Sequence, residues 1–246
     1  MDARLIIDGL ADGRWNMAVD ELLFVRSIQE RTATLRCYGW SPATLSLGYF
    51  QQAAARESHA PSRSLTLVRR TTGGGAIVHD QELTYSLVLP LQEDRPHVAR
   101  NLVSKVHGIL RDLFVAWGAA VRCCKPGEGR GDGENPFLCF QRRTADDLVL
   151  EGYKVVGSAQ RRQHATLLQH GSILVRQSSF APELLGIEDL SPLVEVRESL
   201  LLEWPQRLAK ACDLVLTPGE LTPSERAGAS QIATEKYGAE RWNAKR

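Results

Sequence analysis

The sequence predicts an α+β fold with a mixed β-sheet, and three observations lead to this prediction. Strand-like and helix-like stretches follow one another without the strict strand–helix alternation of a doubly wound nucleotide-binding fold. The strand-like stretches over 147–175 follow one another directly, as in a meander. The chain has 246 residues, of which 43% are hydrophobic and 24% charged, which suits a substantial core without metals or disulfides. We therefore expect a single domain over 1–246.

The first part of the chain is expected to combine short strands with two long helices. Short runs bounded by turn residues predict strands over 4–9, 33–38, 44–49, 65–70 and 83–89. Helical periodicity predicts helices over 14–29 and 96–117. Asp12 or Gly13 is expected to cap the first helix. Its apolar stripe is expected to consist of Met17, Leu22, Val25 and Ile28.

The middle of the chain is expected to hold a loop and a hairpin. A strand is predicted over 119–123. The stretch 125–136 is rich in glycine and charge and has nothing to bury, so we expect a mobile loop. The turn-forming pair Glu151-Gly152 predicts a hairpin of strands 147–150 and 153–157.

The last part of the chain is expected to change from strand to helix. Residues 167–175 are expected to form a strand pair or one bulged strand. From about 180 to 246 the pattern predicts a helical portion that ends in a polar helix over 222–242.

Composition argues against several classes of protein. The formal net charge of +1 does not favour binding to nucleic acid or to a membrane. The N-terminus lacks a basic leader followed by an apolar stretch, and no apolar run approaches the roughly 18 residues that span a bilayer. The five cysteines are odd in number and scattered, and none lies in a zinc-ligand spacing. We therefore expect a cytoplasmic protein without a metal site.

The segment RRTTGGGAIVHD over 69–80 is the first with the groups for binding or catalysis. Three consecutive glycines let a ligand lie against the backbone, whose amides bind a carboxylate, phosphate or carbonyl oxygen. Arg69 and Arg70 add charge, and His79 adds a group that exchanges protons. A glycine-rich hairpin with a solvated basic flank explains the segment equally well. It matches neither GxxxxGK[ST] nor GxGxxG.

Three further side chains are candidates for catalysis. Lys154 begins an apolar strand, and in a pocket desolvation would favour its neutral amine, although an exposed strand lysine is the commoner case. His170 lies between Gln169 and Gly171 and is either catalytic or a satisfied structural histidine. Cys139 is flanked by apolar residues, as a core thiol would be, but lies beside the predicted loop, where a nucleophile would be able to reach a site.

Together these segments resemble the biotin/lipoate protein ligase superfamily and, within it, the octanoyltransferases of lipoate assembly. The resemblance covers most of 12–175, in family order, and beyond 175 it is only general. The matching stretches are DGRWNMAVDELL (12–23), LRCYGWSPATLSLGYFQ (35–51), VRRTTGGGAIVHDQELTYSLVLP (68–90), LCF (138–140) and EGYKVVGSAQRR with LLQHGSILV (151–175).

This resemblance implies a catalytic domain like that of biotin ligase, akin to the class II aminoacyl-tRNA synthetase and biotin synthetase folds, with a mixed sheet backed by helices. It makes Cys139, followed by Phe140, the acyl-accepting nucleophile and Lys154 the second catalytic residue. Residues expected to bind substrate are Arg70, Gly73, Gly74, Gly75, His79, Gly157, Ser158, Ala159 and His170.

The implied reaction moves an octanoyl group from a carrier-protein thioester, through acyl-Cys139, to a lysine of a lipoyl domain. Backbone amides would stabilise the oxyanion. Lys154 as an ammonium would favour the Cys139 thiolate, and as a neutral amine would take the proton of the incoming lysine. Because the donor is already a thioester, no cofactor is expected. Apolar side chains around 45–50 and 83–89 are candidates for an acyl tunnel, and core packing explains them equally well.

The implied partners are proteins. The donor is an acyl carrier protein or another octanoylated carrier, and the acceptor is a lipoyl domain or the glycine-cleavage carrier protein. The basic pairs Arg142-Arg143 and Arg161-Arg162 would meet an acidic carrier, although solvated surface charge explains them as well.

Two departures from the octanoyltransferase pattern keep other functions open. Gly75 stands where these transferases usually have arginine and the related ligases have glycine, and 141–147 lacks the usual pattern. HDQELTYS (79–86) follows the transferases. The alternatives are an ATP-dependent lipoate-protein ligase, which would need ATP and Mg²⁺, and an octanoyl amidotransferase between lipoyl domains. A non-catalytic module that binds an acyl or lipoyl carrier is the third.

Overall fold

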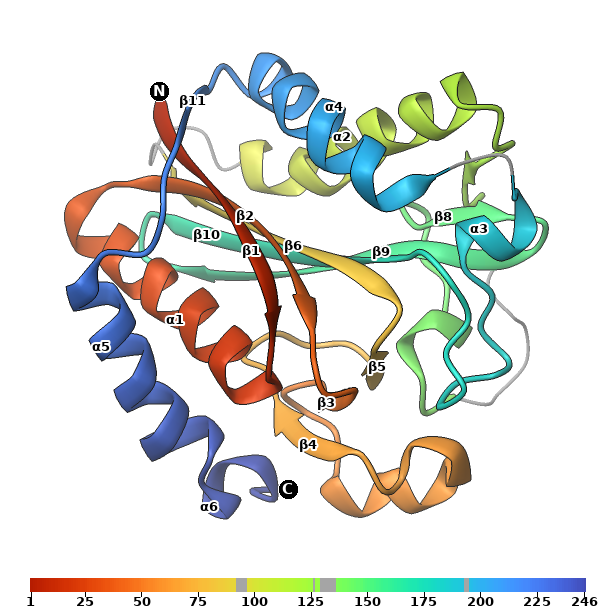
Figure 1. The fold of residues 1–246 in the computed structure, drawn as a ribbon, viewed down its shortest axis with the longest axis horizontal. Helices are drawn as coiled ribbons and strands as arrows, with labels where there is room; N and C mark the ends of the chain where they lie inside the picture. Colours follow the sequence, from red (N-terminus) through yellow and green to blue (C-terminus); the bar gives the residue numbers. More distant parts are fainter. Residues whose placement is uncertain (92–96, 126, 129–135, 193–194) are drawn as a thin grey trace.

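An eight-stranded mixed sheet runs through the middle of the molecule (Figure 1). The computed structural model describes residues 1–91, 97–125, 127–128, 136–192 and 195–246. In spatial order the strands are β11 (Val215–Pro218), β1 (Asp2–Ala11), β2 (Ala33–Trp40), β6 (Glu82–Pro90), β10 (Thr166–Leu174), β9 (Tyr153–Gln163), β8 (Leu148–Leu150) and β7 (Arg122–Cys123). The first three are parallel and the rest pair antiparallel, which confirms the predicted mixed sheet.

Helices cover both faces of this sheet (Figure 1). On one face lie α1 (Gly13–Glu30) and α5 (Pro223–Ile232), and on the other α2 (His97–Ala116) and α4 (Val196–Ala211). Each pair buries its own apolar cluster against the strands, with Phe24 in the first and Leu110 and Trp204 in the second. The short helices are η1 (Ala53–Ser58), η2 (Ala60–Ser62), η3 (Cys139–Gln141), α3 (Ile187–Leu190), η4 (Ala233–Tyr237) and α6 (Glu240–Asn243).

A smaller three-stranded sheet lies beside one end of the large sheet (Figure 1). It consists of β4 (Thr66–Arg69), β3 (Thr44–Leu47) and β5 (Ile77–His79). The residues between β4 and β5, 70–76, contain the three glycines and are called the glycine loop below. The sequence predicted the strands that flank this loop but not that they form a separate sheet.

The first predicted helix is confirmed, but its predicted apolar stripe is partly wrong. Asp12 caps the helix by accepting a hydrogen bond from the Trp15 N–H at 2.9 Å. Met17 is buried, whereas Val25 is 42% exposed. The buried face also holds polar Asn16 and Asp20, because these side chains bind a buried arginine, described below. Hydrophobic periodicity therefore misjudged the inward face.

Two predictions for the second half need correction. Residues 167–174 belong to one strand, β10, that pairs in unbroken register with β6 and β9. The strand is buried on both faces, and its polar residues Gln169, His170 and Ser172 have partners inside the protein. The portion after 180 is not wholly helical, since β11 adds a parallel strand next to β1. β11 is short and mostly exposed, so it has little hydrophobic signal. By contrast, the predicted hairpin at Glu151-Gly152 is confirmed, with φ of +48° and +84°.

The loop predicted over 125–136 lies mostly outside the described residues. Within the described part of the chain, no helix has the length and apolar character needed to cross a membrane.

Candidate active site

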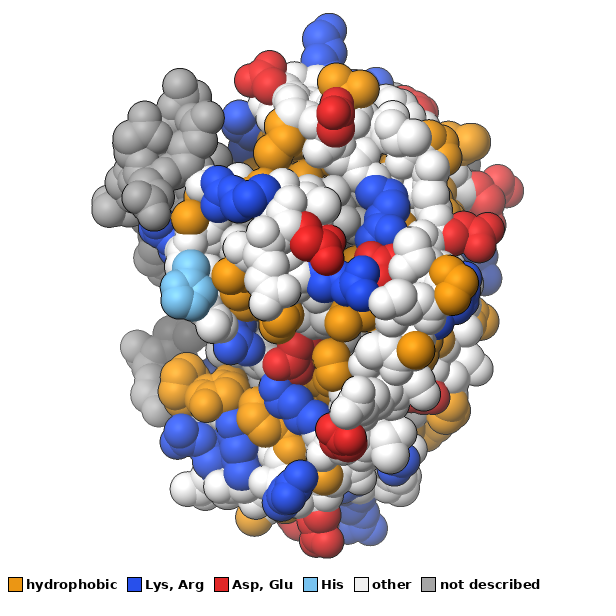
Figure 2. Space-filling view, turned by 90° about the vertical axis from the view of Figure 1, so that its left-hand side faces the viewer, with side chains coloured by type: hydrophobic (Ala, Val, Ile, Leu, Met, Phe, Trp, Pro, Cys, Tyr) orange, Lys and Arg blue, Asp and Glu red, His pale blue; other side chains and the backbone are white. Residues whose placement is uncertain are grey.

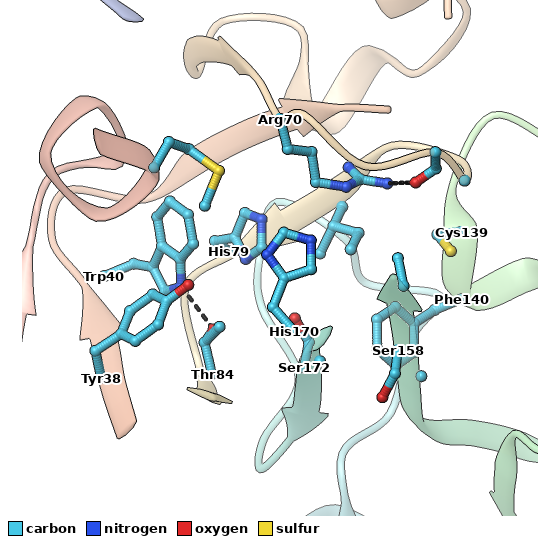
Figure 3. A pocket seen from close by; sticks show the side chains of 17 residues that line it. Tyr38, Trp40, Arg70, His79, Thr84, Cys139, Phe140, Ser158, His170 and Ser172 are labelled. Carbon is cyan, nitrogen blue, oxygen red and sulfur yellow. Dashed lines mark hydrogen bonds between the residues drawn. The ribbon is translucent and has the colours of Figure 1, made fainter. Parts of the chain in front are cut away.

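A pocket of about 510 Å³ lies between the glycine loop and strands β2, β6, β9 and β10 (Figure 3). Its lining residues are Met17, Tyr38, Trp40, Arg70, Gly73, Gly74, Ile77, His79, Thr84, Cys139, Phe140, Gly157, Ser158, Ala159, His170, Gly171 and Ser172. Of the predicted site residues, all but Gly75 and Lys154 line it.

The apolar end of the pocket differs from the one expected. Met17, Tyr38, Trp40 and Ile77 supply apolar surface there, and from the stretches 45–50 and 83–89 only Thr84 reaches the pocket. Leu45 and similar residues pack instead in the core of the small sheet. Of the two explanations for these stretches, acyl tunnel or core packing, the structure favours core packing, because most of their apolar side chains lie in the cores.

The glycine loop is packed too closely for side chains at two points. A Cβ on Gly48 would come within 2.0 Å of the Gly74 carbonyl oxygen, and Gly74 has a φ of +97°, which favours glycine. The Tyr49 N–H donates to the Thr72 carbonyl at 2.8 Å. At the start of the loop, the Arg69 N–H donates to Asn243 Oδ1 at 2.9 Å, and Trp242 Nε1 donates to the Arg69 carbonyl at 2.8 Å. Helix α6 therefore holds the loop from outside.

Arg70 is a buried cation without a carboxylate partner among the described residues. Its guanidinium donates to the carbonyl oxygens of Ser46, Gly73 and Gly75 at 2.7–3.0 Å. Burial lowers the pKa of Arg70 to about 10, although the charges of Cys139 and Glu82 act to raise it. Backbone oxygens carry only partial charge, so Arg70 leaves an excess of positive potential in the pocket.

Cys139 lies directly opposite this guanidinium across the glycine loop (Figure 3). A Cβ on Gly74 would be 3.7 Å from Cys139 Sγ and 3.1 Å from Arg70 Nη2, so both groups face the same glycine. The Cys139 N–H donates to the Ala76 carbonyl at 2.7 Å, which fixes the start of η3 against the loop. The geometry gives the thiol a nearby cation, and that cation is Arg70.

Gly75 lies behind Cys139 and not in the pocket. A Cβ there would come within 2.9 Å of the Cys139 nitrogen and 3.1 Å of Arg142 Nε. The side chain of Arg142 therefore occupies the space that a side chain at 75 would enter. Arg142 Nε also donates to the Pro136 carbonyl at 2.7 Å, which fixes the Arg142 side chain next to the Cys139 backbone.

Lys154 lies beneath the pocket, not in its wall. Its Nζ is 2.9 Å from Asp147 Oδ2, and both side chains are 5% exposed. A Cβ on Gly157 would come within 2.5 Å of Lys154 Cε, so the absent side chain of Gly157 is what gives the lysine room. The Phe140 ring lies 5.4 Å from the ammonium. The sequence predicted Lys154 but missed Asp147, whose place just before β8 was the available signal.

His170 and His79 line the pocket with both ring nitrogens engaged. His170 contacts Thr72 Oγ1 at 2.6 Å through Nε2 and Asp20 Oδ2 at 3.5 Å through Nδ1. His79 contacts Ser46 and Glu82, and its ring stacks on Trp40 at 3.8 Å between centroids. Burial lowers the pKa of His79 despite the opposing charge of Glu82. Both histidines therefore have the contacts of residues that order the wall.

Asp20 connects this wall to helix α1, and sequence reasoning missed it. It accepts hydrogen bonds from Arg36, Tyr38 and Ser86 at 2.8–3.0 Å. Burial alone raises the pKa of Asp20, but the hydrogen bond from His170 and the Arg36 charge outweigh it, so the pKa lies below its usual range. The sequence carried no signal for this network, because the predicted apolar stripe of the helix lay on a different face.

A chain of hydrogen bonds fixes which way the Ser158 hydroxyl points. His107 Nδ1 contacts the Asp146 carbonyl at 2.5 Å and must donate, so Nε2 accepts from Ser158 Oγ at 2.6 Å. Tyr85 then donates to Ser158 at 2.6 Å and accepts from the Gln169 amide at 2.9 Å. Burial lowers the pKa of His107, which keeps this arrangement. The Ser158 hydroxyl is thus held by His107 and Tyr85 and points away from the cavity (Figure 3).

No group of three or more His, Cys, Asp or Glu side chains is arranged as metal ligands in the described ranges. All five cysteines are free thiols. Cys139 is the cysteine that lines the pocket.

The comparison with protein families shows which family the chain belongs to. The family described as "Lipoyl protein ligase A/B catalytic domain" matches residues 12–192. The chain belongs to this family. Membership accords with the pocket, because the stretches that build its walls, from Met17 to Ser172, fall inside the matched residues.

Three relatives that match over nearly their full length carry the name Octanoyltransferase LipM. Octanoyltransferase LipM of Geobacillus kaustophilus is 33% identical over 274 aligned residues, covering 99% of this chain and 98% of the relative. The protein of that name from Kyrpidia tusciae is 34% identical over 271 residues, covering 98% and 97%. The one from Bacillus subtilis is 33% identical over 277 residues, covering 99% and 98%.

Solved structures in the family share the fold. A lipoate protein ligase from Thermoplasma acidophilum with bound lipoic acid has a TM-score of 0.77 at 22% identity, and each chain is fully covered. Lipoate-protein ligase A bound with ATP has a TM-score of 0.76 at 23% identity, with 99% of each chain covered. The fold expected from the sequence resemblance is therefore confirmed.

Proposed function

We propose that this protein is an octanoyltransferase that moves an octanoyl group through a thioester on Cys139 to the amine of a protein lysine. One observation carries the proposal: in a chain about one-third identical to octanoyltransferases over its full length, the thiol lines a largely apolar pocket beside a buried cation. A thiolate is the nucleophile that such a transfer needs.

The first half-reaction is a thioester exchange. The Cys139 thiolate attacks the acyl carbonyl of the donor thioester, a bond from Sγ to the acyl carbon forms, and the donor sulfur leaves as a thiolate. In the second half, an uncharged lysine amine attacks the acyl-Cys139 carbonyl. The new bond is an amide, Sγ leaves as a thiolate, and one amine proton must pass to a base.

Arg70 and Lys154 have different roles in this proposal. The guanidinium of Arg70, which has no carboxylate within ion-pair distance among the described residues, stabilises negative charge on Sγ and on the nearby oxyanion. Lys154 is paired with Asp147, so Lys154 Nζ passes one of its protons to the Asp147 carboxylate as it takes the proton of the incoming amine.

The partners follow from the reaction. The donor is an acidic carrier protein with a thioester-linked octanoyl group, and the acceptor is a lipoyl domain or the glycine-cleavage carrier protein. No cofactor enters, because the donor thioester is already activated.

Intact-protein mass spectrometry tests this proposal. Incubation with octanoyl carrier protein, without ATP, is expected to add the mass of one octanoyl group to the wild-type protein and none to Cys139→Ala. A Cys212→Ala variant is the matched control, since Cys212 lies outside the pocket, and it should label normally. Transfer at the wild-type rate by Cys139→Ala would overturn the proposal.

The same two proteins, incubated with ATP in a second assay, separate the ATP-dependent ligase, which Gly75 kept open in the sequence. A ligase would release pyrophosphate from lipoate or octanoate plus ATP and would tolerate loss of the thiol. We expect no pyrophosphate from the wild-type protein, and its release at equal rates by the wild-type protein and by Cys139→Ala would favour the ligase.

A further inference from the structure

A group of aromatic and basic side chains forms a continuous surface next to the glycine loop. It consists of Tyr49, Phe50, Arg161, Trp242, Lys245 and Arg246 and is called the docking face below. Phe50 is 69% exposed and meets Tyr49 edge-on, with 4.9 Å between ring centroids. Figure 2 shows basic side chains bordering hydrophobic ones towards the lower end of the molecule, the end at which helix α6 lies in Figure 1.

The cations of this face rest on aromatic rings. Lys245 Nζ lies 3.5 Å from the Tyr49 centroid and 3.8 Å from that of Trp242, and the Arg246 guanidinium lies 5.3 Å from that of Phe50. The hydrogen bond from Lys245, together with the charges of Lys245, Arg246 and Arg161, lowers the pKa of the Tyr49 phenol. Lys245 and Arg246 therefore both lie against the half-buried Tyr49 ring.

These cations have no ion-pair partner in the part of the chain that the structure describes. The contrast with Lys236 is direct, because Lys236 also faces the Trp242 ring, at 4.0 Å, but pairs with Glu21 at 2.6 Å. Unpaired like charges held side by side repel one another, so a partner with carboxylates would lower the energy of this arrangement.

The docking face is joined to the rim of the pocket. Phe50 Cδ2 lies 3.9 Å from where a Cβ of Gly73 would be, and Gly73 lines the pocket. The Tyr49 N–H binds the Thr72 carbonyl of the same loop at 2.8 Å. A protein seated on the face therefore lies next to the entrance that leads to Cys139.

We propose that the docking face is the binding surface for an acidic carrier domain, which it holds so that the attached acyl thioester reaches Cys139. This inference rests on the proposed function. Donor and acceptor domains must use the same entrance in turn, because both react at one sulfur atom. The aromatic rings contribute contact area, and the cations contribute steering and register.

Nucleic acid is the other class of partner that basic and aromatic side chains bind, through its phosphates and its bases. The position of the face beside the thiol favours the carrier domain, since an oligonucleotide brings no group that reacts there.

Acylation rates of Cys139 with two donors test the proposal. One donor is octanoyl carrier protein and the other is the uncharged octanoyl thioester of N-acetylcysteamine. In the double variant Lys245→Glu/Arg246→Glu, we expect kcat/KM with the carrier to fall about tenfold or more, and its salt dependence to weaken. With the small thioester we expect a change of less than about twofold.

A charge-matched control is available on α4, on the other side of the molecule (Figure 1). Arg207→Glu/Lys210→Glu makes the same change in net charge on an exposed surface and should leave both donors nearly unaffected.

Three results would overturn the docking proposal. The first is an equal loss in the docking-face and control variants, or with both donors. The second is an unchanged rate with the carrier in the docking-face variant. The third is salt-dependent binding of a single-stranded oligonucleotide that the docking-face variant loses while carrier acylation persists. If neither donor acylates the wild-type protein, the proposed function itself fails, and the docking proposal fails with it.

Discussion

The two buried cations beside Cys139 have opposite electrostatic surroundings. Arg70 binds backbone carbonyls and has no carboxylate partner in the described residues, whereas Lys154 forms a 2.9 Å ion pair with Asp147 beneath the pocket. An unpaired cation projects its charge onto the thiol, while a paired cation is screened by its partner. The difference teaches that the conspicuous lysine of a motif need not be the group that stabilises the thiolate.

The largest expected effect comes from breaking the pair. Asp147→Asn leaves the Lys154 ammonium buried without a counter-charge, and removing one partner of a buried pair costs about 3–5 kcal/mol. We expect this loss in the free energy of unfolding measured with urea. The double variant Asp147→Asn/Lys154→Met should recover most of it. A loss below about 1 kcal/mol in the single variant would mean that the pair is solvated and the contrast with Arg70 is weaker than described.

The next effect separates the two cations at the thiol. We expect Arg70→Met to slow alkylation of Cys139 by iodoacetamide about tenfold or more at neutral pH, because the thiolate loses a nearby cation. The double variant Asp147→Asn/Lys154→Met removes both members of an ion pair, so the net charge of the site is kept and the rate should change less than about twofold. Arg70→Lys keeps the charge and should retain part of the rate, which separates charge from loop packing. Equal slowing by the double variant and by Arg70→Met would contradict the assignment.

A smaller effect is expected from a single methyl group. Gly157→Ala places a Cβ within 2.5 Å of Lys154 Cε and must displace the amine, so we expect transfer to a lysine acceptor to slow about tenfold. Acylation of Cys139 by the donor should be nearly unchanged, because Arg70 is untouched. Gly108→Ala, on α2 with nothing within 4 Å, is the matched control and should preserve both rates. If Gly157→Ala slowed only the acylation of Cys139 by the donor, the roles given to Arg70 and Lys154 would have to be exchanged.

The smallest effect concerns the histidine next to each cation. Burial lowers the pKa of His79, on the Arg70 side, and of His107, on the Lys154 side, from 6.5. Below that pH the unfolded chain binds the extra protons first, so the free energy of unfolding falls as the pH falls. The slope reaches at most about 1.4 kcal/mol per pH unit for each histidine.

Variants at histidine test this slope in urea unfolding from pH 7 to pH 5. His107→Gln should flatten it, while His164→Asn, at an exposed turn where Asn tolerates the positive φ, should leave it unchanged. A steeper slope in His107→Gln would show that His107 is protonated in the folded protein.

Much of the fold was predictable from the sequence because its strands and helices carry their own periodicity, as α2 and the hairpin at Glu151-Gly152 illustrate. β11 was not predictable, since it is held by its pairing with β1 and not by its own apolar residues. The segments that supply the candidate site were also predictable, because three consecutive glycines and a lysine on an apolar strand are recognisable in a sequence. The roles of Cys139 and Lys154 stay predictions.

The partners of these side chains were not predictable. The fold brings Asp147, Asp20 and His107 into contact with the residues of the site. Their positions along the chain do not indicate these contacts. Hydrophobic periodicity predicted the wrong buried face for α1. The true buried face holds polar side chains that bind a buried arginine, so the apolar pattern in the sequence indicates a different face.

The hydrogen bonds between α6 and Arg69 also imply an order of events during synthesis. Arg69 and Asn243 are 174 positions apart, and at about 5–20 residues per second a ribosome needs roughly 9–35 s to make that stretch. The nascent chain therefore has its thiol, its lysine and its glycines long before the residues that hold the loop in place emerge. We therefore expect the glycine loop to take its final position beside Cys139 only after α6 has been made.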